Sequence, residues 1–230
     1  MSGFLYNLLI VLAWAMVLLI VTLVAYKILI DWQIKQILQN GRQREDCAYR
    51  LLALRFGTSS LLRHILLPIQ PVAGSQYCDF DLLMVGRGGI LVITLKGQTG
   101  FIENPMRGDW RAFTRTQTQQ FANPFELNAL RVAAVRNILA EEQFTNVPVH
   151  SIVAFMRPVK FKNRFSQVVT AEQLIPSVVN LNKNRFLTGE EIRNVTRLLR
   201  KYARKRPPRN PAAPAPSPSV PQRMPGSAHR

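Results

Sequence analysis

The chain has 230 residues and a mass of 26.1 kDa, enough for one large domain or two small ones with a buried core. Thirty basic residues against thirteen acidic residues give a formal net charge of +17, while 47% of all residues are hydrophobic. This combination excludes a wholly disordered chain and an ordinary acidic cytosolic enzyme. The two cysteines, Cys47 and Cys78, are too few for a disulfide scaffold or a four-cysteine zinc site, and they indicate a reducing compartment.

The first 26 residues carry no charged side chain, and the apolar run continues to Ile30 with Lys27 as its one charged interruption. A helix rises about 1.5 Å per residue and needs roughly 20 residues to cross the hydrocarbon, so residues 4–30 are expected to form a transmembrane helix. A cleaved signal peptide is the alternative, but the basic start of such peptides is missing. Basic residues follow the run and none precedes it. This bias predicts a single-pass protein of the bacterial inner membrane with its domain in the cytoplasm.

The other end of the chain has a different composition. Residues 207–230 hold eight of the fifteen prolines together with alanine and serine, which predicts a disordered tail. Residues 192–230 contain ten basic residues and no acid, so more than half of the net charge lies there. We expect this region to contact DNA or RNA phosphates, with anionic lipid near the anchor as a competing partner. The candidate nucleic-acid-binding residues are Arg200, Lys201, Arg204, Lys205 and Arg206.

Between these ends the pattern predicts mixed α and β structure. Apolar spacing indicates a helix over 42–56, and two apolar runs joined by a glycine-rich turn at 86–89 indicate a β-hairpin of strands 78–85 and 90–95. Capping signals predict a helix that begins at Asn123-Pro124 and a final helix after the capping box of Thr188 and Glu191. Further strands are expected at 100–103, 110–114 and 147–156.

Acidic and basic side chains meet on the predicted hairpin. Asp79 and Asp81 lie two residues apart on its first strand, and Lys96 ends the second strand. The antiparallel pairing therefore places an acid and a lysine in one neighbourhood. The three histidines have no partner at metal-ligand spacing, and we interpret them as ordinary core or surface residues.

The segment FDLLMVGRGGILVITLKGQTGFIE, followed by Trp110 and by NPFELNALRVAAVRNIL, resembles the nuclease-related domain (NERD) family of the PD-(D/E)xK nuclease-like superfamily. The resemblance runs from about Glu45 to Met156. It implies a restriction-endonuclease-like α/β fold, with a mixed central sheet flanked by helices. A domain over 40–160 and a helical extension over 161–206 would follow. It also implies Glu45 and Asp81 as metal ligands and Lys96 as the catalytic lysine.

Two positions depart from the family pattern. Thr94 stands where the family has the Glu of Glu-x-Lys, and Leu127 stands where its helix often has Gln. Mg²⁺ prefers carboxylates, so a neutral hydroxyl at position 94 should weaken its binding. We expect Glu45, Asp81, Thr94 and Lys96 to converge in one polar cleft that binds Mg²⁺ weakly and cleaves little.

The sequence therefore favours a membrane-anchored nuclease-related protein that binds nucleic acid with a degenerate metal site. One alternative is an active Mg²⁺-dependent nuclease with a rearranged site, to which Asp79 or Glu103 contributes a ligand. Another is an inner-membrane interaction scaffold without catalysis, whose tail contacts protein partners.

Overall fold

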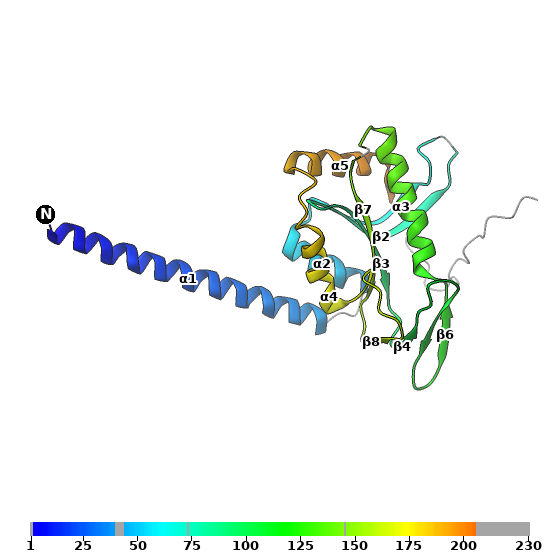
Figure 1. The fold of residues 1–230 in the computed structure, drawn as a ribbon, viewed down its shortest axis with the longest axis horizontal. Coiled ribbons are helices and arrows are strands. Elements are labelled where there is room, and N and C mark those ends of the chain that lie inside the picture. Colours follow the sequence, from blue (N-terminus) through cyan, green and yellow to red (C-terminus); the bar gives the residue numbers. More distant parts are fainter. Residues whose placement is uncertain (1, 40–43, 73, 145, 206–230) are drawn as a thin grey trace, which may run out of the picture.

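The structure is a computed structural model that describes residues 2–39, 44–72, 74–144 and 146–205. Its described part is a mixed α/β domain with two mixed sheets and five helices (Figure 1). The side chains of residues 2–13, 31, 34–39, 44 and 45 are outside the description. The tail expected over 207–230 lies outside the described residues altogether.

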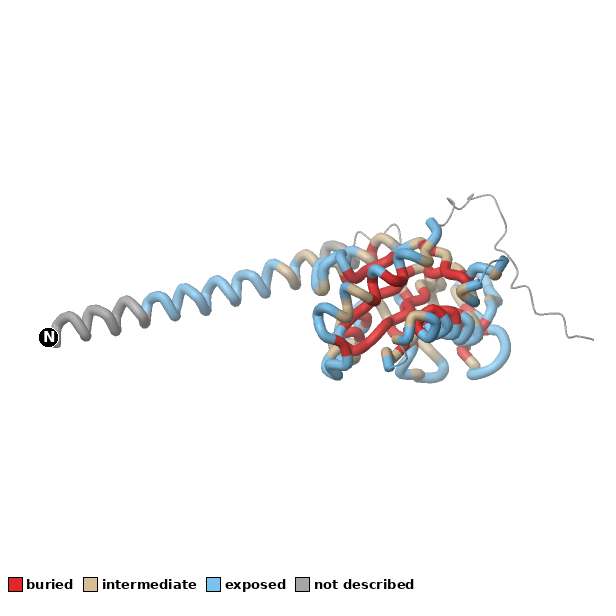
Figure 2. The backbone as a smooth tube through the Cα atoms, turned by 90° about the horizontal axis from the view of Figure 1, so that it is seen from above, coloured by how far each residue is buried: buried red, intermediate tan, exposed pale blue. Residues whose placement is uncertain are grey.

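Helix α1 (Ser2–Gln39) projects away from the domain, as Figures 1 and 2 show, and α2 (Arg44–Phe56) follows it against the domain. Among the residues that the structure describes, no helix combines the length and the apolar character needed to cross a membrane.

The larger sheet contains the predicted hairpin. Strands β2 (Tyr77–Gly86) and β3 (Gly89–Lys96) pair antiparallel, and Gly86 opposite Gly89 closes the turn, which confirms the prediction. Gly89 has φ 113°, and a Cβ there would meet the Pro148 carbonyl oxygen at 2.2 Å, so the turn requires glycine. The six strands run in the order β10-β1-β2-β3-β7-β9. The remaining four are β1 (Leu61–Pro68), β7 (Val149–Phe155), β9 (Val168–Thr170) and β10 (Arg204–Lys205).

Helices cover both faces of this sheet. Helix α3 (Pro124–Glu141) and helix α5 (Gly189–Tyr202) bury one core with Leu83, Val85 and Val92. Helix α2 and helix α4 (Ala171–Leu181) bury a second core with Leu82 and Ile93 on the opposite face. Neighbouring strand residues such as 82 and 83 point to opposite faces, and both faces are apolar because both are covered. The predicted helices thus flank the sheet as expected.

The expectation of one central sheet needs correction, because a second sheet follows Lys96. Its four strands have the order β6-β5-β4-β8 and pack around Trp110, whose ring stacks on Phe155 with centroids 6.3 Å apart. The sequence predicted the first two of these strands but not that they leave the hairpin to form their own sheet. They are β4 (Gly100–Glu103), β5 (Trp110–Phe113), β6 (Thr118–Phe121) and β8 (Val159–Phe161).

The chain after residue 160 contributes to the main sheet as well as to the helical layers. Helix α5 begins with the predicted capping box, in which the Thr188 hydroxyl accepts from the Glu191 N–H and the Glu191 carboxylate accepts from the Thr188 N–H. The strands β9 and β10 extend the two edges of the sheet. The C-terminal segment is therefore built into the same core as the hairpin.

Candidate functional site

The site is centred on Asp81 of β2, a position at which the regular pairing of β2 with both neighbouring strands is interrupted. Paired residues of β2 and β3 end at Leu82 and Ile93, and the pairing of β2 with β1 skips position 81 opposite His64, which has φ 51°. At this position a side chain replaces the strand–strand hydrogen bond: Asp81 Oδ2 accepts the Leu95 N–H at 3.1 Å. The carboxylate is thereby held between the two strands.

A buried guanidinium from α3 lies against this carboxylate. Arg131 Nη1 is 3.5 Å from Asp81 Oδ2, and the two side chains are 3% and 13% exposed. The same nitrogen donates a hydrogen bond to the Thr94 hydroxyl, which donates in turn to Asn128 Oδ1. An arginine side chain stays charged at every pH a folded protein meets, so the site holds a permanent internal cation.

Apolar and basic groups surround the ion pair. The Phe80 ring lies 5.9 Å from the guanidinium carbon of Arg131. Burial raises the pKa of the Cys78 thiol, an effect that the Arg131 charge opposes and the Asp79 charge increases. Burial also lowers the pKa of Lys96, and the Arg131 charge adds to this while the Asp81 charge opposes it. The pKa of Lys96 therefore depends on the charges of both Asp81 and Arg131.

Helix α3 positions the two polar side chains by its cap and its spacing. Asn123 caps the helix by accepting the Phe125 N–H at 2.9 Å, and Pro124 fits the first turn because its missing N–H is not needed there. Residues three and four apart then share the face that packs on the sheet. Asn128 and Arg131 occupy this face near its start, and Ala134, Val135 and Ile138 continue it as apolar core.

The structure brings two of the four predicted catalytic residues together at Arg131, and the Nζ of a third, Lys96, lies 5.4 Å from the Phe121 ring centroid. Asp81 and Thr94 share Arg131 as a partner, and the charge of Asp81 acts on Lys96. Thr94 is only 2% exposed and is therefore buried beneath α3, where we expected it to line an open cleft. Glu45 lies in the first turn of α2, which covers the opposite face of the sheet, and its side chain is outside the described residues.

Sequence reasoning missed Asn128 and Arg131, which complete the site. It singled out Leu127, which is half-buried, whereas the adjacent Asn128 makes the polar contact. The helix pattern did contain an indication of them: Asn128 and Arg131, three positions apart, are polar residues on a face that is otherwise apolar. Their partner lies on a strand 37 residues before Arg131, which the helix pattern alone does not indicate.

The described residues do not fit a Mg²⁺ ion at Asp81. Mg²⁺ would bind a carboxylate oxygen at about 2.0 to 2.1 Å and need further oxygen ligands around it. Here the same oxygen faces a guanidinium, Thr94 is engaged by Arg131 and Asn128, and Lys96 adds a second positive group nearby. Within the described part of the chain, no three acidic, histidine or cysteine side chains gather closely enough to hold a metal.

Neither of the two acids considered as substitute metal ligands, Glu103 and Asp79, is placed to complete the site. Glu103 stands on β4 of the second sheet and pairs with Lys162 Nζ at 2.6 Å. Asp79 lies beside Cys78 on β2. Neither restores the carboxylate that Thr94 replaces.

The basic residues proposed for nucleic-acid contact gather at the outer edge of the larger sheet. Arg200 and Lys201 end α5, and Arg204 and Lys205 form β10; all four are exposed. Arg200 donates to the Ser59 carbonyl at 2.8 Å, Lys201 pairs with Glu142 at 3.1 Å, and Arg204 stacks 4.4 Å from the Tyr77 ring centroid. Arg206 lies outside the described residues.

Comparison with protein families adds one finding. A family model described as NERD, nuclease-related domain, matches residues 40–156, just over half of the chain. Comparisons with curated proteins and with solved structures gave no match.

The buried ion pair generates a prediction about stability. Replacing Arg131 with Met leaves the Asp81 carboxylate largely buried without its cation, and we expect a loss of about 3 kcal/mol in the free energy of unfolding. Asp81→Asn likewise leaves the buried Arg131 guanidinium without its anionic partner, and we expect a similar loss. The double variant removes both charges, so its loss should be at least about 1 kcal/mol smaller than the sum of the two single losses. Urea unfolding of the whole chain measures all four proteins, and additive losses would contradict a direct pairing.

Proposed function

The chain belongs to the nuclease-related domain family, and from this premise we propose that it is a nucleic-acid-binding member in which an internal cation stands in for the metal. The observation that carries the proposal is the buried contact of Arg131 with Asp81 and Thr94. Thr94 removes one negative charge from the family's ligand pattern, and the buried Arg131 places a positive charge beside Asp81. Both features oppose the binding of a divalent cation.

This arrangement disfavours metal-dependent cleavage. In nucleases that depend on Mg²⁺, the metal orients water and neutralises charge on the phosphate. A guanidinium can neutralise phosphate charge, but it does not generate a metal-bound nucleophile. Arg131 is 3% exposed and already has two partners, so its primary effect is to fix α3 against β2 and β3.

A cleavage assay tests the loss of activity. We expect the whole chain to show no Mg²⁺- or Mn²⁺-dependent nicking of plasmid DNA or RNA. Thr94→Glu alone should stay inactive, because the new carboxylate would pair with Arg131. Thr94→Glu combined with Arg131→Gln removes the competing cation and should gain metal-dependent nicking that Lys96→Ala reduces. Strong cleavage by the unmodified chain that Asp81→Ala abolishes would establish the active-nuclease alternative instead.

The proposed binding surface is the basic edge formed by Arg200, Lys201, Arg204 and Lys205. Supporting this are the exposure of all four side chains and their position on neighbouring elements, the end of α5 and β10. Lys201 is exposed and pairs with the half-buried Glu142, and a phosphate can replace this partner at little cost because ion pairs open to solvent are weak. Anionic lipid headgroups would meet the same charges and are the competing partner.

Binding to this edge predicts a local effect of mutation. Arg204→Ala with Lys205→Ala should weaken binding to a single-stranded or double-stranded oligonucleotide and lower the slope of log affinity against log salt by about 1 to 2. Lys183→Ala with Arg185→Ala removes the same charge from the exposed loop between α4 and α5 and serves as the matched control. Equal effects of the two pairs, or binding to anionic vesicles alone, would contradict a nucleic-acid site at β10.

We further propose that residues 4–30 anchor the chain in the bacterial inner membrane with its domain in the cytoplasm. Support comes from the first 26 residues, which carry no charged side chain, and from the described part of α1, where large apolar side chains such as Trp14, Leu18 and Leu23 are at least 59% exposed. An exposed apolar surface of this kind needs a membrane or a partner.

Topology can be measured directly. Protease added outside intact spheroplasts should spare the domain, because the basic residues that follow the apolar run keep it on the cytoplasmic side. Protease added after lysis should digest exposed sites of the domain in the same sample. Digestion before lysis would contradict the orientation, and recovery of the chain in the soluble fraction would contradict the anchor.

A further inference from the structure

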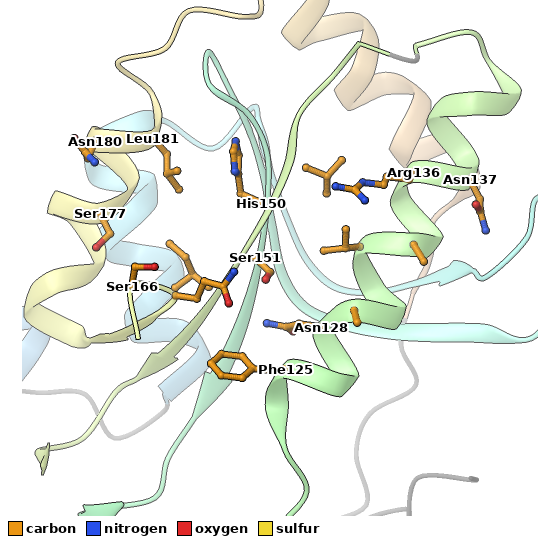
Figure 3. A pocket seen from close by; sticks show the side chains of 16 residues that line it. Phe125, Asn128, Arg136, Asn137, His150, Ser151, Ser166, Ser177, Asn180 and Leu181 are labelled. Carbon is orange, nitrogen blue, oxygen red and sulfur yellow. The ribbon is translucent and has the colours of Figure 1, made fainter. Parts of the chain in front are cut away.

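A groove of about 830 Å³ runs along the edge of the larger sheet between α3 and α4 (Figure 3). Its floor is the first half of β7, residues 149–152, and its walls come from residues 125–137 of α3 and 177–181 of α4. Twelve helical steps along α3 make it about 18 Å long. It is therefore long and narrow enough for a segment of extended polypeptide.

The floor of this groove is an open strand edge. β7 pairs with β3 along its whole length but with β9 only from Val153 onward. The Ile90 N–H donates to the Pro148 carbonyl and the Met156 N–H donates to the Lys96 carbonyl, so the even-numbered backbone groups of β7 face β3. The Val153 N–H donates outward to the Gln167 carbonyl.

By this alternation, Val149 and Ser151 direct their N–H and C=O groups into the groove. Within the described part of the chain, no backbone hydrogen bond reaches these groups. An unpaired strand edge is a template for an added strand. The added strand would continue the line of β9, which already occupies this edge next to Val153.

The lining adds a second, independent indication of a ligand. Asn128 is 1% exposed and lines the groove, and its Nδ2 has no hydrogen-bond partner among the described residues. A buried donor without a partner is costly, so this nitrogen needs an acceptor. The lining also includes Arg136 and no carboxylate, which disfavours a basic ligand.

We propose that the groove binds residues 212–219 of a second copy of this chain, added as an edge strand beside Val149 and Ser151. The sequence of this segment, AAPAPSPS, has proline at every second position from 214 to 218. In an extended strand, alternate N–H groups point to the same side, so Ala213, Ala215, Ser217 and Ser219 keep one complete donor edge. The prolines, which lack N–H groups, fall on the other edge, where no pairing is needed.

The charge and size of the segment match the groove. No charged residue occurs from Asn210 to Gln222, so nothing in this stretch repels Arg136. Alanine and serine side chains fit between walls that carry Ala129, Ala133 and Ser177. The carbonyls of the segment supply acceptors for the open N–H groups and for Asn128 Nδ2.

The distance along the sheet assigns the segment to a second copy. The described chain ends at β10, and the position beside the first half of β7 is five strand steps away in the order of the sheet. At about 4.8 Å per step this is about 24 Å in a straight line. Residues 206–212 reach at most about 25 Å when fully extended, which leaves no length for the detour around a helical layer that their path requires. The chain's own segment therefore falls short.

Cysteine crosslinking between whole chains tests the source. Ser151→Cys chains are mixed with chains that carry one cysteine at position 213, 215, 217 or 219, and the native Cys47 and Cys78 are buried. We expect a disulfide-linked dimer for at least one tail position with Ser151→Cys. None is expected with Ser59→Cys, an exposed control outside the groove. A link that forms only when both cysteines are in one chain, or equally with the control, would overturn the proposal.

A labelled peptide of residues 208–222 tests the alternation, with its binding to the whole chain followed by fluorescence polarisation. Ala215→Pro removes an N–H from the donor edge and should weaken binding by about tenfold. Ala212→Pro makes the same substitution at a position whose N–H faces away, and it should change binding less than about twofold. Equal effects of the two substitutions, or no binding of the unmodified peptide, would overturn the added-strand geometry.

Discussion

The contact between Asp81 and Arg131 is the constraint on which the site depends. The pairing of β2 with β3 begins only at Leu82, and the Asp81 carboxylate, one residue earlier, accepts the Leu95 N–H of β3. A largely buried carboxylate is stabilised by a cation beside it, because an uncompensated charge away from water is costly. In a metal-dependent nuclease that cation is the metal, whereas here α3 supplies a guanidinium. A threonine at position 94 suits a guanidinium in this place, because its hydroxyl accepts a hydrogen bond from Arg131 and donates one to Asn128 at the same time.

The same helix couples the two sites. Asn128 contributes its oxygen to Thr94 on one side and lines the groove beside β7 on the other. A ligand that accepts from Asn128 Nδ2 would therefore fix the amide that orients the Thr94 hydroxyl. The basic edge at β10 and the groove at β7 lie on opposite sides of the hairpin in the strand order, so the ion pair, the groove and the basic edge use different strands of one sheet.

Local patterns in the sequence predicted the parts of the fold that local forces determine. The glycine-rich turn and two apolar runs gave the hairpin, and the capping signals at Asn123 and Thr188 gave the starts of two helices. Strands β9 and β10 have three and two residues, too few for any periodicity, and they form only because the sheet edge pairs with them. Arg131 was missed for the same reason, because its role depends on a partner 50 residues away in Asp81.

Manganese binding followed by electron paramagnetic resonance tests the central claim most directly, because free and bound Mn²⁺ give different signals. The account predicts that the unmodified chain takes up no Mn²⁺ in a manner that depends on Asp81. Arg131→Gln should gain such binding, and Arg131→Gln combined with Asp81→Asn should lose it again. Tight, stoichiometric Mn²⁺ binding by the unmodified chain that disappears in Asp81→Asn would contradict the account, since the carboxylate would then hold a metal despite the guanidinium beside it.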